Sequence, residues 1–353
     1  MSLQRSTLEN FFNRTWAKRG LSACLLLPFS LLFHLLSLVR RSLYSTGLLR
    51  SQRVSVPVII VGNIFVGGTG KTPLTIWLVD ALRVAGFHPG VISRGYGRNS
   101  DSALAVHLNS SAEIVGDEPL LIAQRAQCPV MVGRDRVAVA RALLASHPEV
   151  DVIVSDDGLQ HYPLARDIEI VLSDARGVGN GWLLPAGPLR ESVTRRRDFS
   201  VHNVGNGAPI SAPDDWPVFA MQLSGDQAFP LLDDGAKASA VTRPLRSFVE
   251  MDQSLRIVAA AGIGNPGRFF DMLRAEGLQF DALPFPDHFD FAGNPFAQTE
   301  ADIILMTEKD AVKCRQNDAL RNDTRLWVVP VTAHLDDVLA EKIVEKLRGH
   351  STT

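Results

Sequence analysis

The sequence has few cysteines and no large excess of charge of either sign. Three cysteines, Cys24, Cys128 and Cys314, are spread over 353 residues and form no C-x-x-C pair. Disulfides and a structural zinc site are therefore not expected, and a reducing compartment suits the chain. With a formal net charge of −2, we also expect no nucleic-acid partner. A chain of this length should hold two domains.

Charged side chains are absent from one stretch near the N-terminus. Residues 21–39, LSACLLLPFSLLFHLLSLV, are uncharged, whereas residues 1–55 as a whole carry eight Lys or Arg against one Glu. As a helix, the uncharged run would span roughly 30 Å of hydrocarbon. Pro28 and His34 weaken it as a spanning segment. A helix lying in the membrane interface is one alternative, and a buried core helix is another.

A cleaved signal peptide fits this run poorly, because Arg40 and Arg41 close it and no small-x-small site follows. We predict that residues 1–50 form a membrane anchor whose basic flanks favour anionic lipid. The rest of the chain is expected to face the cytoplasm, where nucleotides are used. We expect no obligate protein partner.

A glycine is missing from the most informative motif. Residues 61–73 read VGNIFVGGTGKTP and nearly match the phosphate-binding pattern G-x-x-x-x-G-K-[ST]. Gly70, Lys71 and Thr72 fit the end of this pattern, but Phe65 occupies the position of the first glycine. A strict pattern search would reject the stretch. The physical requirement is weaker, because a phosphate cradle needs glycine freedom mainly in the residues before the lysine.

The flanks of the loop also favour nucleotide binding. The apolar run 56–62 is typical of a buried strand, and residues 73–85 have apolar positions at helical spacing. A strand, a glycine loop and a helix together place an anion at the helix N-terminus. Lys71 would reach the β- and γ-phosphates of a nucleoside triphosphate, and the Thr72 hydroxyl would ligate Mg²⁺. The predicted nucleotide-binding residues are Phe65, Val66, Gly67, Gly68, Thr69, Gly70, Lys71 and Thr72.

Strands and helices alternate after this loop. The pattern predicts strands at 89–92, 129–132, 150–155 and 168–172, with helices near 117–127 and 135–146. This alternation is typical of a mostly parallel sheet with helices on both faces. The Gly-, Pro- and Asp-rich residues 205–217 predict a linker to a smaller second α/β domain. We therefore predict an α/β fold of the P-loop NTPase type, divided into an anchor at 1–50, a P-loop domain at 51–204 and a second domain at 205–353.

Two carboxylates end one of the predicted strands. Residues 150–161, VDVIVSDDGLQH, form an apolar strand that ends in Asp156 and Asp157. Carboxylates at the C-terminal end of a strand near a phosphate loop are where Mg²⁺ is held, directly or through water. The alternative is a solvated turn without a ligand.

An acid and a histidine in separate domains are candidates for proton transfer. Asp117 in GDEP, residues 116–119, begins a predicted helix, so it is either an N-cap or a general base for an acceptor hydroxyl. His288 lies beside an acid in PDHF, residues 286–289. A lone histidine is more often structural, so His288 gains a role only if the two domains close over one site.

Two further motifs resemble nucleotide signatures without matching them. GIGNPG at 262–267 fits G-x-G-x-x-G, but Asn265-Pro266 stiffens the turn and the expected acid is not clearly placed. TEKD at 307–310 resembles the guanine-selecting T-K-x-D, with the lysine one place late. Neither motif predicts a dinucleotide site or a GTPase.

Taken together, the motifs make the chain resemble the tetraacyldisaccharide 4′-kinases, the lipid A 4′-kinases of Gram-negative bacteria. The resemblance covers nearly the whole chain, and the missing glycine is typical of that family. The motifs are GNIFVGGTGKTP at 62–73, SRGYGR at 93–98, GDEP, GRDR at 133–136, DDGLQH at 156–161, LLPAGPLRE at 183–191, GIGNPGRF at 262–269, PDHF and TEKD.

The resemblance implies an ATP- and Mg²⁺-dependent kinase at the cytoplasmic face of the inner membrane. Its acceptor would be the 4′-hydroxyl of a membrane-borne disaccharide lipid, and its product would be lipid IVA. By similarity, Asp117 would act as the base, His288 would orient or tune it, and Lys71 would hold phosphates. The metal-binding residues would be Thr72, Asp156 and Asp157, with Glu191 as a further metal or nucleotide contact.

The resemblance also implies an arginine-rich site for the lipid head group. The acceptor already carries a phosphate, and a planar guanidinium group can bind a phosphate through two hydrogen bonds. The residues expected there are Arg94, Tyr96, Arg134 and Arg136.

The alternative function is a P-loop NTPase switch or metal-insertion chaperone. Such proteins often carry a lysine just before the double glycine, where this chain has Val66. They also lack a membrane segment, and metal handlers usually contain Cys/His clusters. ATP turnover with and without a lipid acceptor distinguishes the two functions.

Overall fold

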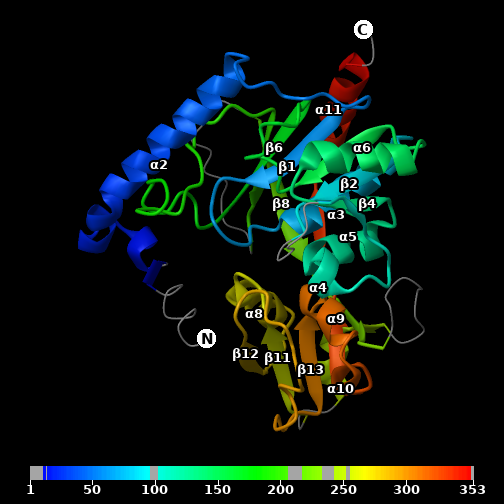
Figure 1. The fold of residues 1–353 in the computed structure, drawn as a ribbon. Helices are drawn as coiled ribbons and strands as arrows, with labels where there is room; N and C mark the ends of the chain where they lie inside the picture. The colour runs from blue at the N-terminus through cyan, green and yellow to red at the C-terminus, as the bar shows by residue number, and fades with distance from the viewer. Residues whose placement is uncertain are drawn as a thin grey trace.

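Figure 1 shows the computed structural model, which describes residues 11–12, 14–95, 102–205, 217–232, 242–251 and 255–350. Two α/β units lie one above the other, and the long helix α2 (Leu21–Ser45) runs along one side of the first unit. The last helix, α11 (Asp337–His350), also belongs to the first unit. The chain therefore leaves the first unit, builds the second and returns.

The first unit is a sheet covered by helices. Its other elements are β1 (Val58–Asn63), α3 (Lys71–Val84), β2 (Pro89–Ser93), β3 (Leu104–Ala105), α4 (Ala112–Val115), α5 (Asp117–Ala126), β4 (Val130–Val132), α6 (Arg136–Ser146), β5 (Val152–Asp156), β6 (Ile168–Asp174), β7 (Phe199–Asn203), β8 (Val218–Ser224) and β15 (Thr332–Leu335). Within the described residues the strand order is β15-β8-β7-β6-β1-β5-β2-β4-β3. Strands from β8 to β4 are parallel, and β15 and β3 are antiparallel at the edges. The predicted mostly parallel sheet is confirmed.

The second unit is a smaller α/β layer. Its elements are β9 (Gln227–Pro230), β10 (Arg243–Pro244), α7 (Leu245–Met251), β11 (Ile257–Ala261), α8 (Pro266–Ala275), β12 (Asp281–Pro284), β13 (Ile303–Thr307), α9 (Glu308–Cys314), α10 (Asp318–Arg321) and β14 (Leu326–Val329). Among the described residues its sheet has the order β10-β9-β14-β13-β11-β12. The four strands from β14 to β12 are parallel. The predicted second α/β domain is therefore present.

The structure divides the chain differently from the domain boundary predicted at residue 205. Strand β8 continues the first sheet beyond that point, and β15 pairs with β8. Helix α11 then packs Leu339, Ile343 and Leu347 into the core of the first unit. The linker predicted at 205–217 lies almost entirely outside the described residues. Sequence periodicity does not encode which distant strands pair, so it could not reveal this return.

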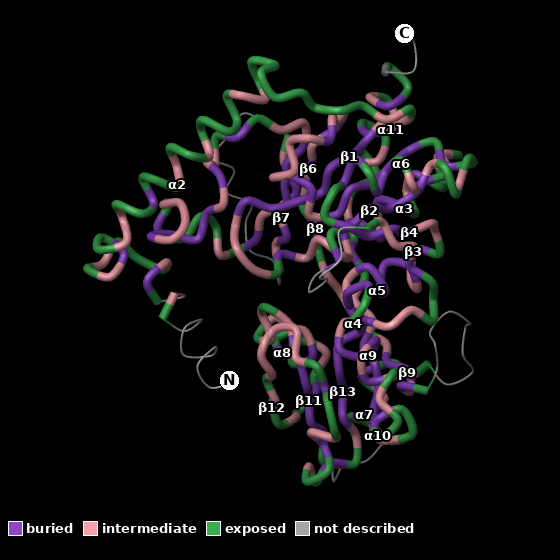
Figure 2. Tube along the Cα trace, in the orientation of Figure 1, coloured by how far each residue is buried: buried purple, intermediate pink, exposed green. Residues whose placement is uncertain are grey.

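The central strand β1 is buried at every position (Figure 2). Its alternate side chains pack into two separate cores. Ile59 and Val61 pack with α3, α5 and α11 on one face of the sheet. Val58 and Ile60 pack with α6 on the other face. Helices on both faces confirm the predicted layers, and the loop that follows β1 begins from a fully buried strand.

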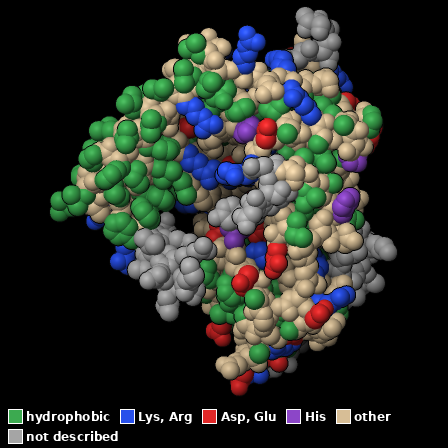
Figure 3. Space-filling model, in the orientation of Figure 1, with side chains coloured by type: hydrophobic (Ala, Val, Ile, Leu, Met, Phe, Trp, Pro, Cys, Tyr) green, Lys and Arg blue, Asp and Glu red, His purple; other side chains and the backbone are tan. Residues whose placement is uncertain are grey.

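Helix α2 contacts the first unit along one side only. The Ser30 hydroxyl donates to the Leu183 carbonyl at 2.7 Å, and Trp16 Nε1, just before the helix, donates to the Pro185 carbonyl at 2.9 Å. Apolar side chains gather over its outer side (Figure 3), where Leu25 is 74% exposed. Among the described residues, this helix is long and apolar enough to cross a membrane. Its exposed apolar side is compatible with membrane association.

Candidate active site

The phosphate loop connects β1 to α3 at the carboxyl edge of the first sheet. Gly67 and Gly70 have φ values of 100° and 101°, which glycine adopts at little cost. Helix α3 begins at Lys71, and among the described residues no side chain caps its first N–H groups. These amides are therefore available to an anion. The strand, glycine loop and helix lie as the sequence predicts.

Asn63, the last residue of β1, holds this loop together. Its buried Nδ2 donates to the carbonyls of Phe65 at 2.7 Å and Gly67 at 3.2 Å, and to Thr69 Oγ1 at 3.1 Å. Its Oδ1 accepts from Lys71 Nζ at 3.4 Å. A single amide thus couples the shape of the loop to the position of the lysine.

The structure explains why Phe65 replaces the usual glycine. Phe65 forms an antiparallel bridge with Leu189, and its φ is not positive. Glycine is therefore not required there. The Arg176 guanidinium lies 4.5 Å from the Phe65 ring centroid, and its Nη2 donates to the Gly68 carbonyl at 3.0 Å. The phenyl ring supports an arginine that fixes the glycine segment of the loop.

Asp156 and Asp157 lie at the carboxyl end of β5, the strand next to β1. Lys71 Nζ is 3.6 Å from Asp157 Oδ1. Asp156 is buried, and its carboxylate accepts from Thr75 Oγ1 at 3.4 Å and Ser93 Oγ at 3.3 Å. The predicted phosphate lysine and the predicted metal-binding acids therefore meet at one edge of the sheet.

The electrostatics of these carboxylates suit a divalent cation. Burial, reinforced by the negative charge of Glu118 and Asp157, raises the pKa of Asp156 above its ordinary value. A bound cation would remove this cost to the ionised form. Magnesium usually takes one or two protein carboxylates together with phosphate oxygens and water. Asp156, Asp157 and the hydroxyl of Thr72, the second residue of α3, match that donor set.

Asp117 is the first residue of α5, and side chains of the second unit surround its carboxylate. Its Oδ2 lies 3.0 Å from His288 Nδ1 and 2.9 Å from Lys313 Nζ. Its Oδ1 accepts from the Glu118 amide at 3.0 Å, whereas Gly116 takes the N-cap position. The carboxylate is therefore directed across the boundary between the units, and helix capping accounts for only one of its contacts.

Positive charge keeps Asp117 ionised although the residue is only 3% exposed. Burial alone would raise its pKa. The hydrogen bond with His288 and the charges of Lys309 and Lys313 outweigh burial and hold the pKa of Asp117 well below its ordinary value. Lys309 also pairs with Glu118 at 2.9 Å. Two lysines of α9 therefore connect the second unit to the start of α5.

The glycine turn after β11 lies against the phosphate loop. A Cβ added to Gly264 would lie 3.1 Å from the Gly68 backbone nitrogen and 3.1 Å from Asp287 Oδ2. Asp310 of the TEKD motif accepts from the Gly262 amide at 2.9 Å and so holds this turn in place. GIGNPG and TEKD, which the sequence left without a nucleotide role, bring the second unit close to the loop.

The residues expected to bind the lipid head group lie in different environments. Arg94, directly after β2, and Arg134, two residues before the start of α6, are both exposed. Both follow the carboxyl ends of parallel strands, the edge that carries the phosphate loop. Tyr96 lies outside the described residues.

Arg136 differs from the other two arginines, because it is only 3% exposed. Its guanidinium donates to the carbonyls of Gly133 at 2.9 Å and Asp156 at 3.2 Å. Burial lowers the pKa of Arg136 to about 10. The structure therefore gives Arg136 a structural task, supporting the strand end that carries Asp156, in place of the predicted contact with a head group.

Glu191 is buried in a network of its own. Its Oε1 accepts from Gln160 Nε2 at 3.0 Å, and its Oε2 accepts from the Tyr162 hydroxyl at 3.0 Å. Arg195 forms an ion pair with the same carboxylate. Protein groups therefore bond both oxygens, and the metal or nucleotide contact expected of Glu191 stays a prediction.

Comparison with known proteins agrees with this geometry. The chain matches the family model LpxK, Tetraacyldisaccharide-1-P 4′-kinase, over residues 22–348. The chain belongs to this family. A tetraacyldisaccharide 4′-kinase of Herminiimonas arsenicoxydans is 67% identical over 355 residues, with 99% of each chain covered. One of Aromatoleum aromaticum is 48% identical over 335 residues, covering 94% of this chain and 96% of the relative.

A solved structure of a more distant relative has the same fold. It is a crystal structure of LpxK from Aquifex aeolicus in complex with ATP, which is 30% identical to this chain with a TM-score of 0.75. The match covers 92% of this chain and 99% of that chain. The likeness extends over both α/β units.

Several residues that organise the kinase site were not found by sequence reasoning. Asn63 lies two residues before the position where the loop pattern begins, so the pattern assigns it no role. Lys309 is part of TEKD, and Lys313 follows it by four residues, which places both on one face of α9. Arg176 has no local sequence signal, because its role comes from contacts with the distant Phe65 and Gly68.

Proposed function

We propose that this kinase transfers the γ-phosphate of ATP to the 4′-hydroxyl of a membrane-borne tetraacyldisaccharide 1-phosphate, giving lipid IVA. The observation that carries the proposal is the contact of Asp117 with His288 beside a phosphate loop. Gly264 of the second unit lies against Gly68 of that loop. The proton-accepting pair and the nucleotide can therefore share one cleft between the units.

The nucleotide would bind at the loop after β1. The loop amides and Lys71 hold the β- and γ-phosphates. Thr72, Asp156 and Asp157 would hold Mg²⁺, which when bound neutralises charge on the transferring phosphate. Asn63 keeps Lys71 aligned with the loop through its Oδ1.

Asp117 would accept the proton of the 4′-hydroxyl. Its lowered pKa makes it a weak base, but it also ensures that the carboxylate is ionised at neutral pH. Phosphoryl transfer passes through a loose transition state, so positioning matters more than basicity, and protein kinases use an aspartate for the same step. His288 and Lys313 hold the carboxylate in one orientation from the opposite unit.

The acceptor would be bound by residues at the same sheet edge. The exposed Arg94 and Arg134 offer guanidinium groups for its phosphate, and Tyr96 is proposed to join them. An arginine at these positions is favoured over lysine, because the planar group forms two parallel hydrogen bonds with a phosphate.

We propose that the protein sits on the cytoplasmic face of the inner membrane with α2 lying in the interface. Ser30, in the interior of α2, is bonded to the body of the protein, as is Trp16, just before the helix. Because α2 is attached to the body in this way, a membrane-spanning α2 would pull the body of the protein into the bilayer. Its outer side, with Leu25 and Phe29 exposed, suits the boundary between head groups and acyl chains.

The test is phosphate transfer from labelled ATP to the purified tetraacyldisaccharide 1-phosphate, with the site of phosphorylation determined by mass spectrometry. We expect a lipid product phosphorylated at the 4′ position and little ATP consumption without acceptor. An acceptor whose 4′-hydroxyl is blocked is the control. ATP hydrolysis that proceeds equally without acceptor, and no phosphorylated lipid, would instead favour a nucleotide switch.

Deleting residues 1–40 tests the membrane part of the proposal. The truncated protein should leave the membrane fraction in large part while it still binds ATP, since the phosphate loop belongs to a separately packed core. Sedimentation with membranes as complete as that of the intact chain would contradict the role of α2.

A further inference from the structure

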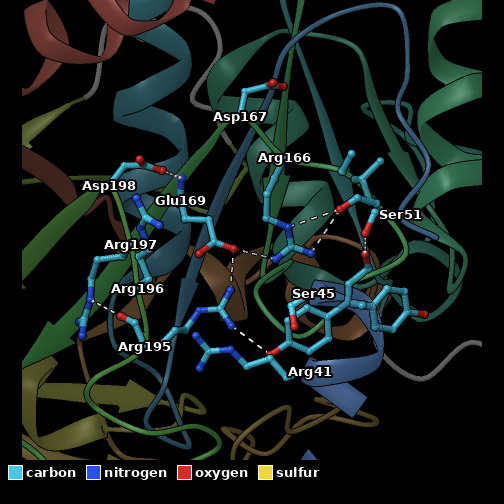
Figure 4. A pocket seen from close by; sticks show the side chains of 14 residues that line it. Arg41, Ser45, Ser51, Arg166, Asp167, Glu169, Arg195, Arg196, Arg197 and Asp198 are labelled. Carbon is cyan, nitrogen blue, oxygen red and sulfur yellow. Dashed lines mark hydrogen bonds and ion pairs between the residues drawn. The ribbon is translucent and has the colours of Figure 1, made fainter. Parts of the chain in front are cut away.

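A charged cavity lies at the edge of the first sheet opposite to the phosphate loop. Its volume is about 520 Å³, and it opens between the C-terminal end of α2 and the loops that lead into β6 and β7 (Figure 4). These loops enter the parallel strands at their amino ends, whereas the phosphate loop leaves β1 at its carboxyl end. The six residues of β1 separate the two edges by about 20 Å. The cavity is therefore no part of the site described above.

Arginine dominates the lining of this cavity. Five arginines and three acidic residues face it, and each acid already has a cationic partner. Asp167 pairs with Arg53 at 2.8 Å and Asp198 with Lys346, and neither of these cations lines the cavity. The third acid, Glu169, is shared by two of the lining arginines, Arg166 and Arg195.

Arg41 and Arg196 carry the excess charge. Arg41 ends the apolar part of α2, and Arg196 lies in the loop before β7. Both are exposed, and among the described residues neither has an acidic partner. The two cations line one cavity from separate elements, and an anion bound there would compensate their charges.

Aromatic side chains hold several guanidinium groups at one wall of the cavity. Tyr44 of α2 stacks on Tyr162 with ring centroids 5.7 Å apart. The guanidinium carbons of Arg40, Arg166 and Arg195 all lie within 5.8 Å of the Tyr162 ring centroid, at 5.7, 5.5 and 5.7 Å. The aromatic pair joins the end of α2 to the body of the protein and gathers guanidinium groups around one wall of the cavity.

The position of the cavity points to a lipid. It lies at the end of a helix whose outer side is apolar, and Arg40 and Arg41 mark the level where that side meets water. A phosphodiester suits convergent guanidinium groups, and the volume is in the range of small-molecule sites.

We propose that this cavity binds the phosphodiester head group of an anionic membrane phospholipid, at a site separate from that of the acceptor. The bound phosphate would bridge Arg41 on α2 and Arg196 on the body, and so fix the helix against the first unit on the membrane. The inference rests on the interfacial position of α2 proposed above. It does not depend on the identity of the acceptor or on the transfer reaction.

The test compares Arg196→Gln with Arg50→Gln in the full-length protein. Arg50 is exposed near the same end of α2 but does not line the cavity, so the two variants lose the same charge. Binding is measured by co-sedimentation with phosphatidylcholine vesicles that contain either phosphatidylglycerol or oleate, matched in surface charge. Loss of one charge near an anionic surface should weaken binding about fivefold whatever the anion.

The wild type should prefer phosphatidylglycerol vesicles to charge-matched oleate vesicles. Arg50→Gln should keep this preference with the general fivefold loss, whereas Arg196→Gln should lose the preference and bind phosphatidylglycerol vesicles at least tenfold more weakly than Arg50→Gln does. Equal effects of the two variants on both vesicle types would overturn the proposal. Binding would then reflect only the general attraction between basic side chains and an anionic surface.

Two further measurements distinguish the ligand sources. Titration calorimetry with inorganic phosphate that shows binding to the wild type but not to Arg196→Gln, without a vesicle preference, would assign the cavity to a free anion and overturn the lipid. Kinase activity of Arg196→Gln in detergent micelles without phospholipid should equal that of the wild type. A raised acceptor KM in micelles would place the acceptor in the cavity and also overturn the proposal. Failure of all lipid phosphorylation with the vesicle preference intact would refute the proposed reaction alone.

Discussion

Replacing Asp117 by asparagine separates proton transfer from the structural contacts of the same side chain. Asparagine has nearly the same shape and can still accept from the Glu118 amide, but it cannot take up the hydroxyl proton. General-base catalysis typically contributes about 10²–10⁴-fold in rate, or about 3–5 kcal/mol of activation free energy. We therefore expect kcat to fall by that factor while the Kd for ATP changes little.

The same substitution also has a cost in stability that can be worked out from the contacts. The buried carboxylate accepts from His288 and Lys313 at 3.0 and 2.9 Å. Charge-assisted bonds of this kind are worth about 1.5–3 kcal/mol, against about 1 kcal/mol for neutral ones. We expect the Asn variant to lose about 2 kcal/mol in the free energy of unfolding, clearly less than the effect on the barrier.

The pH dependence of that loss has a definite sign. The folded pKa of Asp117 lies below its unfolded value of about 4. The stabilisation is therefore fully present above pH 4 and disappears as the pH falls through the folded pKa. The difference in unfolding free energy between wild type and Asn variant should be constant from pH 8 to pH 5 and should shrink in more acidic solution. An acid limb of kcat near neutrality would have to come from another group.

Glu308→Gln is the matched control. Glu308 of α9 pairs with Arg125 of α5 at 2.6 Å, so its loss removes an ion pair between the same two helices without touching Asp117. Lipid phosphorylation, ATP titration and denaturant unfolding are measured for both variants. A kcat for Asp117→Asn within threefold of wild type would refute the base. A fall in kcat as large in Glu308→Gln would assign the effect to the helix contact.

Three further substitutions test the nucleotide site. Lys71→Ala should abolish transfer because the charge beside the β- and γ-phosphates is lost, and normal lipid phosphorylation would rule out the phosphate-loop assignment. Asn63→Ala removes the side chain that makes three hydrogen bonds to the loop. It should lower the free energy of unfolding by about 2–3 kcal/mol and raise the KM for ATP. An unchanged KM would show that the loop keeps its shape without Asn63. Gly264→Ala places a methyl group 3.1 Å from the Gly68 nitrogen and should raise the KM for ATP. Stability should change little, because the backbone φ at this position suits alanine. Wild-type kinetics would show that the two units do not close this tightly during turnover.

Local sequence determined the nucleotide-binding elements, because the forces that shape them act over short distances along the chain. Alternating apolar runs predicted the strands and helices, and the glycines before Lys71 predicted a phosphate loop. In the structure, Gly67 and Gly70 of that loop have positive φ. The apolar, uncharged run at residues 21–39 likewise predicted the helix that the structure shows as α2. The missing glycine at Phe65 could be tolerated on chemical grounds, but its explanation needed the bridge to Leu189, 124 residues away.

Only the tertiary structure decided which distant groups meet. Asp117 and His288 are 171 residues apart, and their contact depends on the order in which two sheets place their strands. The same order returns β15 and α11 to the first unit and buries Arg136 behind Asp156. It also leaves Arg41 and Arg196 beside one cavity, without an acidic partner in the part of the chain that the structure describes. No residue type or local pattern distinguishes a buried arginine from one that binds a ligand. That difference arises from long-range packing, because burial and the neighbouring charges are properties of the folded chain.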